Sequence, residues 1–385
     1  MSALFRKHAA PAASAPPTGS TAPPDADGPA ATDGSALTDG PAVNDGPALT
    51  DGPAVNDGPA VVDGLAVIDA QSTPDPATWA AEHRDTLLGL VAEHGALTVR
   101  GLGLRTPADV EALLHRLADR PATEREAFAA RDVHAEGVYS SSVWPPNQPM
   151  CMHHELSYAT RCPGLLLFAC LRPPTEGGAT AVADSAAVLR TLPTELVDRF
   201  EREGWLLTRT YHDEIGATLT QSFGTEDRGA VEAYCRANAI DWSWQPDGSL
   251  RTRQHRPAVV RHPVSGVRCW FNQIAFLNEW TMPPEVREFL VEEYGPDGLP
   301  FNTRHGNGDP VPQDVVEQIG KAYEAHTVRR PWAAGDLMVV DNIRTAHSRE
   351  AYEGPRELLV AMGNPVHPHS AHAERSAPRS GRAAV

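Results

Sequence analysis

The sequence predicts a mainly β fold with helical decorations (α+β), organised as a sandwich or a jelly roll. From about residue 137 onward, short apolar segments alternate with turn residues; they read GLLLFACL, GATAVADS, PAVVRHPVSGVRCWFN, GDLMVVDN and RELLVAMGN. Strands at this density favour a sandwich or jelly roll. Helical stretches at 186–203, 226–238 and 284–294 interrupt the strands and account for the decorations.

The first seventy residues of the 385-residue chain differ from the rest. Asp-Gly recurs every six residues from Asp27 to Asp63, in a unit that reads D-G-P-A-x-x. A solenoid would need bulky apolar residues at its centre, but the repeat offers mainly Ala, and Pro removes backbone donors. We therefore expect a disordered acidic leader over 1–65, one folded domain over 66–365 and a disordered tail over 366–385.

The folded domain is predicted to open with helices around one strand. Residues 78–95 have helical periodicity and end at a glycine, and 96–103 alternate like a strand. A second helix over 106–120 begins with Thr106 as N-cap, Pro107 in the first helical position and Asp109 in the first turn.

Composition excludes several classes of partner. The formal net charge of −17 argues against binding to nucleic acid or to an anionic membrane surface. No segment approaches the roughly twenty apolar residues that a membrane span needs. The five cysteines are scattered and form no CxxC pair, which is typical of reduced thiols, and no secretory signal is evident. We expect a cytoplasmic protein.

The segment CMHHELSYA, residues 151–159, is the first candidate metal site. In an extended strand, residues i and i+2 project to the same side. His153 and Glu155 would then point together and His154 would point away. One imidazole and one carboxylate cannot complete a metal site, so a third ligand must come from elsewhere in the chain.

His347 is the candidate third ligand. It follows the predicted strand 336–340 and a polar turn. Two histidines and one carboxylate bind one face of an octahedral metal and leave the other positions open, an arrangement that suits oxygen chemistry at non-haem Fe(II).

Arg356 is the candidate partner for a co-substrate. Oxygen activation requires electrons, which a 2-oxo acid can supply, and arginine binds a carboxylate bidentately. If 356–362 is a strand, Arg356 shares a face with Leu358, Val360 and Met362. Because an unpaired charge beside apolar side chains is costly, a carboxylate partner is expected.

With these residues the chain resembles the taurine dioxygenase-like Fe(II)/2-oxoglutarate oxygenases. The matching stretches are HHELSYA, GGATAVADS, LRTRQHRPAVVRHPVSGVRCWFNQ, AAGDLMVVDN and AHSREAYEGPRELLVAM. The resemblance implies a double-stranded β-helix (jelly-roll) core, with His153, Glu155 and His347 on Fe(II). It also implies Arg356 on the distal carboxylate of 2-oxoglutarate and Thr180 as a second anchor for that carboxylate.

The resemblance also implies the reaction. It is closest to the syringomycin-biosynthesis branch, which hydroxylates amino acids for nonribosomal peptides, so the expected substrate is an amino acid, free or presented on a carrier protein. Fe(II), 2-oxoglutarate and O2 would yield succinate, CO2 and an oxidised substrate. In related halogenases a small residue replaces the carboxylate ligand, so Glu155 favours hydroxylation, with desaturation or another oxidation as the alternative.

Five further residues are candidates for contact with substrate. Arg251 and Arg253 could hold an anionic group or a carrier arm, although a solvated strand face explains them equally well. Trp270 and Asn272 are candidates for the pocket lining, with core packing as the rival explanation for Trp270. Tyr139 is a candidate lid residue.

Two alternatives come from other functional classes. Two histidines and one glutamate also form hydrolytic zinc sites, but those usually carry HExxH on a helix, which this sequence lacks, and they do not need Arg356. The second alternative is a binding protein whose functional part is the repeat-containing leader.

The segment NQIAFLNEW, 272–280, departs from the family pattern and is expected near the substrate.

Overall fold

The computed structural model describes residues 60–368 except 63, 72 and 213. The predicted disorder of the leader and of the tail falls almost entirely outside the described residues and stays a prediction. Strand β1 (Ala60–Val62) falls inside the segment 1–65 and pairs antiparallel with β2 (Leu65–Asp69). Among the described residues, regular structure is therefore already present a few residues before the expected start of the folded domain.

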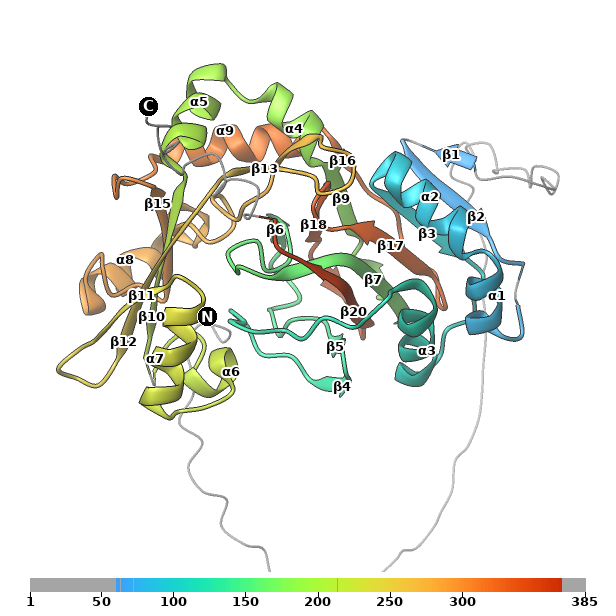
Figure 1. The fold of residues 1–385 in the computed structure, drawn as a ribbon, viewed down its shortest axis with the longest axis horizontal. Helices are drawn as coiled ribbons and strands as arrows, with labels where there is room; N and C mark the ends of the chain where they lie inside the picture. Colours follow the sequence, from blue (N-terminus) through green and yellow to red (C-terminus); the bar gives the residue numbers. More distant parts are fainter. Residues whose placement is uncertain (1–59, 63, 72, 213, 369–385) are drawn as a thin grey trace, which may run out of the picture. The chain divides into compact units, whose positions relative to one another are not determined.

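The largest sheet in the described chain has the strand order β1-β2-β3-β17-β7-β20-β5-β4 (Figure 1). Its central strands are antiparallel and coincide with apolar segments of the sequence: β17 (Leu337–Asp341), β7 (Cys162–Arg172) and β20 (Glu357–Val366). The other members are β3 (Ala96–Arg100), β5 (Val138–Ser140) and β4 (Val133–Ala135).

Both faces of the central strands of this sheet are buried. Successive side chains of a strand project to opposite faces. One face contributes Leu165, Leu167, Ala169, Leu337, Val339, Leu359 and Ala361 to one apolar cluster. The other contributes Leu166, Phe168, Cys170, Met338, Val340, Leu358, Val360 and Met362 to a second cluster. Burial on both sides explains why these strands are continuous apolar runs in the sequence.

Three helices cover the first face: α1 (Pro76–Glu82), α2 (Arg84–His94) and α3 (Pro107–Leu117) (Figure 1). The single helix expected over 78–95 is divided in two at His83, but its end at Gly95 is confirmed, with a left-handed φ of 82°. The start of α3 is also confirmed, because Thr106 and Asp109 form a reciprocal capping box.

A four-stranded sheet faces the second side of the large sheet. Its order is β16-β9-β18-β6, with β16 (Thr327–Val328), β9 (Thr180–Asp184), β18 (Thr345–Arg349) and β6 (Met150–His153). Val182 of β9 belongs to the same apolar cluster as the inner side chains of the large sheet. Two facing sheets, antiparallel except where β2 pairs parallel with β3, with helices outside confirm the predicted jelly-roll (double-stranded β-helix) core with helical decorations.

A second four-stranded sheet, in the order β11-β12-β10-β15, lies beyond this core. Its strands are β11 (Asp241–Trp244), β12 (Leu250–Arg256), β10 (Trp205–Tyr211) and β15 (Phe301–His305). The short pairs are β13 (Val259–Arg261) with β14 (Arg268–Trp270), and β8 (Glu176–Gly177) with β19 (Tyr352–Glu353).

The remaining helices surround these sheets. They are α4 (Ser185–Thr191), α5 (Thr194–Glu203), α6 (Leu219–Phe223), α7 (Arg228–Ala237), α8 (Pro284–Tyr294), α9 (Gln313–Glu324) and the short η1 (Glu279–Thr281). The stretch expected to be helical over 186–203 is interrupted before Thr194, because Pro193 lacks the backbone donor that a continuous helix needs. Helix α9 is not among the predicted elements. Among the described residues, no helix has the length and apolarity to cross a bilayer.

Candidate active site

His153 and His347 meet because their strands are neighbours. Strands β6 and β18 pair antiparallel, and His347 stands directly opposite His153. Residues opposite each other in such a pair project to the same face of the sheet. The two imidazole centroids are 4.3 Å apart, although the residues are far apart in sequence.

Glu155 also lies beside the two histidines, but the strand alternation expected from the sequence does not explain its position. Strand β6 ends at His153, and Glu155 lies in the following turn, so strand alternation does not place its side chain. Asn342 holds this turn instead. Its Oδ1 accepts from the Glu155 amide at 2.8 Å, and its Nδ2 donates to the carbonyls of Glu155 at 2.9 Å and Pro163 at 2.8 Å.

His153, Glu155 and His347 are all buried, and each offers one ligand atom within 4.8 Å of those of the others. Glu155 Oε2 lies 3.8 Å from His347 Nε2. His153 Nδ1 is 2.8 Å from the Cys151 carbonyl; because a carbonyl only accepts, Nδ1 carries the proton and Nε2 keeps a free lone pair. The donor set therefore fits a divalent metal.

Burial also keeps both candidate histidine ligands neutral. Loss of solvation lowers the pKa of His153, and it lowers the pKa of His347 well below the usual value. A neutral imidazole is the form that binds a metal. The state of these side chains therefore matches the proposed ligand role.

His154 faces away from this site, as the sequence predicts, but it is not a surface residue. It is fully buried, with Nδ1 2.6 Å from the Asn342 carbonyl and Nε2 2.8 Å from Ser185 Oγ. Burial lowers its pKa to about 4, so the ring is neutral at physiological pH. It links the turn that carries Glu155 to the start of α4.

Arg356 and Thr180 line the same cavity as the three candidate ligands, together with Phe168, Leu358 and Val360. Arg356 Nε donates to the Gly178 carbonyl at 3.3 Å, and in the described part of the chain the guanidinium has no carboxylate partner. Burial, followed by the charge of Arg349, lowers the pKa of Arg356 to about 10, which leaves it charged at neutral pH. Thr180 Oγ1 accepts from Trp332 Nε1 at 3.2 Å.

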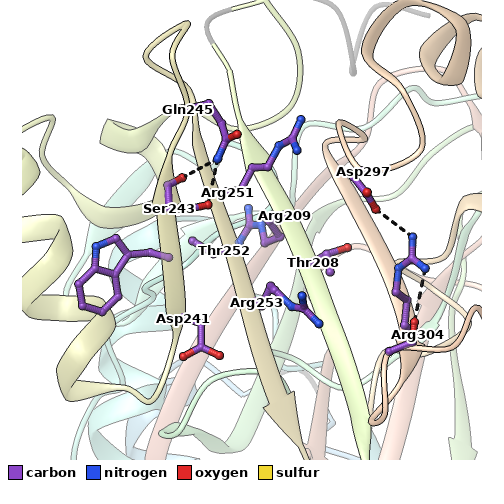
Figure 2. A pocket seen from close by; sticks show the side chains of 12 residues that line it. Thr208, Arg209, Asp241, Ser243, Gln245, Arg251, Thr252, Arg253, Asp297 and Arg304 are labelled. Carbon is purple, nitrogen blue, oxygen red and sulfur yellow. Dashed lines mark hydrogen bonds and ion pairs between the residues drawn. The ribbon is translucent and has the colours of Figure 1, made fainter.

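Arg251 and Arg253 do not line this cavity. They project from β12 into a separate groove of about 520 Å³ on the second four-stranded sheet, beside Thr208 and Arg304 (Figure 2). Arg304 is paired with Asp297 at 3.2 Å, also drawn in Figure 2. The structure therefore does not bring the two arginines together with the candidate metal ligands.

The other three candidate substrate residues also lie outside the metal cavity. Trp270 is fully buried in the largest apolar cluster, where its ring meets Phe200 edge to face. Asn272 Nδ2 donates to the Ala258 carbonyl at 3.0 Å. The hydroxyl of Tyr139 accepts from the Glu124 amide at 2.9 Å, and Tyr139 lines a neighbouring cavity.

Two residues near the metal ligands were not predicted as site residues from the sequence. Phe276 stacks on the His153 ring with centroids 4.5 Å apart and an interplanar angle of 18°. It belongs to the segment 272–280, which the sequence places near substrate. Arg131 donates from Nη2 to Glu155 Oε2 at 3.0 Å. It lies in an irregular stretch without periodicity, so nothing in the local sequence signals its position.

Asn342→Ala is expected to lower the free energy of unfolding by about 2–4 kcal/mol, because it removes a buried amide that makes three hydrogen bonds. It should also weaken metal binding, because the turn that carries Glu155 loses its support. Thermal unfolding and metal titration measure the two effects. A variant with wild-type stability would show that Asn342 does not hold the turn; Asn307→Ala, at an exposed loop, is the control.

Comparison with known proteins identifies the family of the chain. The pattern of the family described as "Taurine catabolism dioxygenase TauD, TfdA family" matches residues 62–362. The chain is 33% identical to the dapdiamide synthesis protein DdaC of Enterobacter agglomerans over 289 residues, 74% of this chain and 88% of the relative. It is 26% identical to a clavaminate synthase-like protein of Arabidopsis thaliana over 284 residues, 71% and 82% of the two chains.

Among solved structures, that of the PvcB protein from Pseudomonas aeruginosa matches with a TM-score of 0.44 and 16% identity, over 78% of this chain and 85% of that one. The family pattern covers most of the described domain, and the identity to DdaC extends over almost the whole of that relative. The chain therefore belongs to the TauD/TfdA family of Fe(II)- and 2-oxoglutarate-dependent dioxygenases.

Proposed function

We propose that this protein hydroxylates an unactivated carbon of an amino acid, free or tethered to a carrier protein, in specialised metabolism. The observation that supports it most directly is the convergence of His153, Glu155, His347 and Arg356 on one cavity. The two ends of 2-oxoglutarate need a metal and a cation, and this cavity offers residues for both.

The residues of the cavity have separable tasks in this proposal. His153, Glu155 and His347 hold Fe(II), which with 2-oxoglutarate and O2 supplies the oxidising power. Arg356 and Thr180 bind the distal carboxylate of 2-oxoglutarate and so orient it towards the metal. Phe168, Leu358 and Val360 form an apolar wall that limits the access of water.

Glu155 supports hydroxylation over chlorination. In related halogenases a small residue stands in place of this carboxylate and leaves room for halide, whereas here the Glu155 carboxylate lies beside both histidines. Desaturation is the alternative outcome with the same ligands, and the mass of the product separates the two.

The role in specialised metabolism is supported by the relative DdaC, whose name assigns it to dapdiamide synthesis. We place the reaction in the cytoplasm. All five cysteines are free thiols, four of them buried, which suits a reducing compartment.

An aerobic screen tests the proposed function. The protein is incubated with Fe(II), 2-oxoglutarate and a panel of amino acids, free and carrier-loaded, and succinate and substrate mass are followed. We expect succinate together with a gain of one oxygen atom in at least one substrate. Tightly held zinc with no O2 consumption would contradict the proposal and favour a hydrolase.

A further inference from the structure

Arg131 is a buried cation to which the proposed reaction assigns no task. Its side chain is 5% exposed, and its Nη2 lies 3.0 Å from Glu155 Oε2. Its Nε donates to Ser142 Oγ at 2.9 Å and lies 3.7 Å from Glu124 Oε1. Nη1 is buried and has no hydrogen-bond partner among the described residues. A buried donor without a partner is costly, so a ligand atom is expected at Nη1.

The charges around the cavity lead to the same expectation. Arg131, Arg349 and Arg356 line it, against Glu155 in the cavity and Glu124 beside Arg131. A divalent metal and the dianion of 2-oxoglutarate balance each other. The arginines then outnumber the carboxylates by one, and excess charge in the interior is unfavourable unless an anion compensates it.

Arg131 also stands where a second ligand can reach it. It lines both the metal cavity and a neighbouring cavity of about 330 Å³, whose wall includes Glu124, Tyr139 and Gln221. A molecule bound in the neighbouring cavity therefore meets the guanidinium next to a metal ligand. This position suits the molecule that is oxidised, because its carbons must approach the metal.

We propose that Nη1 of Arg131 binds a free carboxylate of the primary substrate, so that the enzyme acts on a free acid and not on an acyl group held as a thioester on a carrier. The inference rests on the proposed function and decides between the two forms of substrate that it leaves open. A carboxylate compensates the excess positive charge and matches the guanidinium geometry. A thioester carbonyl is neutral and does neither.

Substrate derivatives test this without altering the protein. Each amino acid of the panel is compared with its primary amide and with its N-acetylcysteamine thioester, and succinate formation is measured. We expect the KM of the free acid to be about 10- to 100-fold lower than that of the amide or the thioester, in which an uncharged group replaces the carboxylate. Equal or better turnover of the amide or thioester would overturn the inference and leave the proposed function intact. Absence of succinate with every compound would instead overturn the proposed function.

Variants of Arg131 locate the carboxylate. Arg131→Met should raise the KM for the free acid about 10- to 100-fold, remove the preference over the amide and leave the KM for 2-oxoglutarate unchanged. Arg131→Lys keeps the charge but loses the planar fork, so it should restore part of the preference. Arg105→Met, at an exposed loop position, is the matched control.

Because Arg131 also holds Glu155, the absorption of the anaerobic Fe(II)–2-oxoglutarate complex is recorded for each variant to verify the metal centre. If Arg131→Met disturbs that complex, the Arg131→Lys variant and the comparison of acids with amides decide whether Arg131 binds the substrate carboxylate. A rise in the KM for 2-oxoglutarate with an unchanged KM for the acid would overturn the inference, since the bound anion would then be the co-substrate.

Discussion

Glu155→Ala is expected to reduce succinate formation to the background level and to weaken Fe(II) binding severely. The variant removes one of three ligands from a site whose donor atoms all lie within 4.8 Å of one another. A small residue at this position would leave the two histidines without the carboxylate that completes the facial set. Succinate assay and anaerobic Fe(II) titration measure the two effects.

Glu155→Gln serves as the control for folding. Alanine would remove the nearest charge partner of the buried Arg131 guanidinium and leave it only Glu124, 3.7 Å away. Loss of one partner of a buried ion pair can destabilise a protein by about 3–5 kcal/mol. The glutamine amide still accepts a hydrogen bond from Arg131 but is a poor metal ligand. We therefore expect Glu155→Gln to lose turnover with a smaller fall in melting temperature. Wild-type turnover by a folded Glu155→Gln protein would show that Glu155 is not a metal ligand.

Arg356→Met is expected to raise the KM for 2-oxoglutarate by about 100-fold or more, because it removes the charge-assisted contact to the distal carboxylate. Stability should change little. The guanidinium makes one hydrogen bond, to the Gly178 carbonyl at 3.3 Å, and its burial already lowers its pKa to about 10. The variant therefore separates co-substrate binding from folding.

Arg356→Lys is the conservative comparison. Lysine keeps the charge but cannot form the bidentate contact, so its KM for 2-oxoglutarate should lie between those of the wild type and Arg356→Met. Steady-state kinetics with varied 2-oxoglutarate measure all three proteins. An unchanged KM in Arg356→Met would show that the distal carboxylate binds elsewhere.

The central strands could be predicted because burial on both faces makes them unbroken apolar runs, as in β7 and β20. The histidines could be proposed from residue type and spacing. Their contact depends on the register of β18 against β6, which the local sequence does not contain. The same limit applies to Asn342 and Arg131, whose partners lie far away along the chain.

Strand β12 shows why the substrate residues were harder to predict. A period of two places Arg251 and Arg253 on one face and Thr252 and Gln254 on the other. Hydropathy does not separate these two polar faces. In the structure both residues of the inward face are buried, and Gln254 donates a hydrogen bond to the buried Glu126. The arginines consequently face the groove of Figure 2 and not the metal cavity.

The most direct test is a crystal structure of the protein prepared without oxygen in the presence of Fe(II) and 2-oxoglutarate. We predict one metal ion bound by His153, Glu155 and His347, chelated by 2-oxoglutarate, with the distal carboxylate of 2-oxoglutarate on Arg356. A metal bound by other residues, or 2-oxoglutarate bound away from Arg356, would contradict the account.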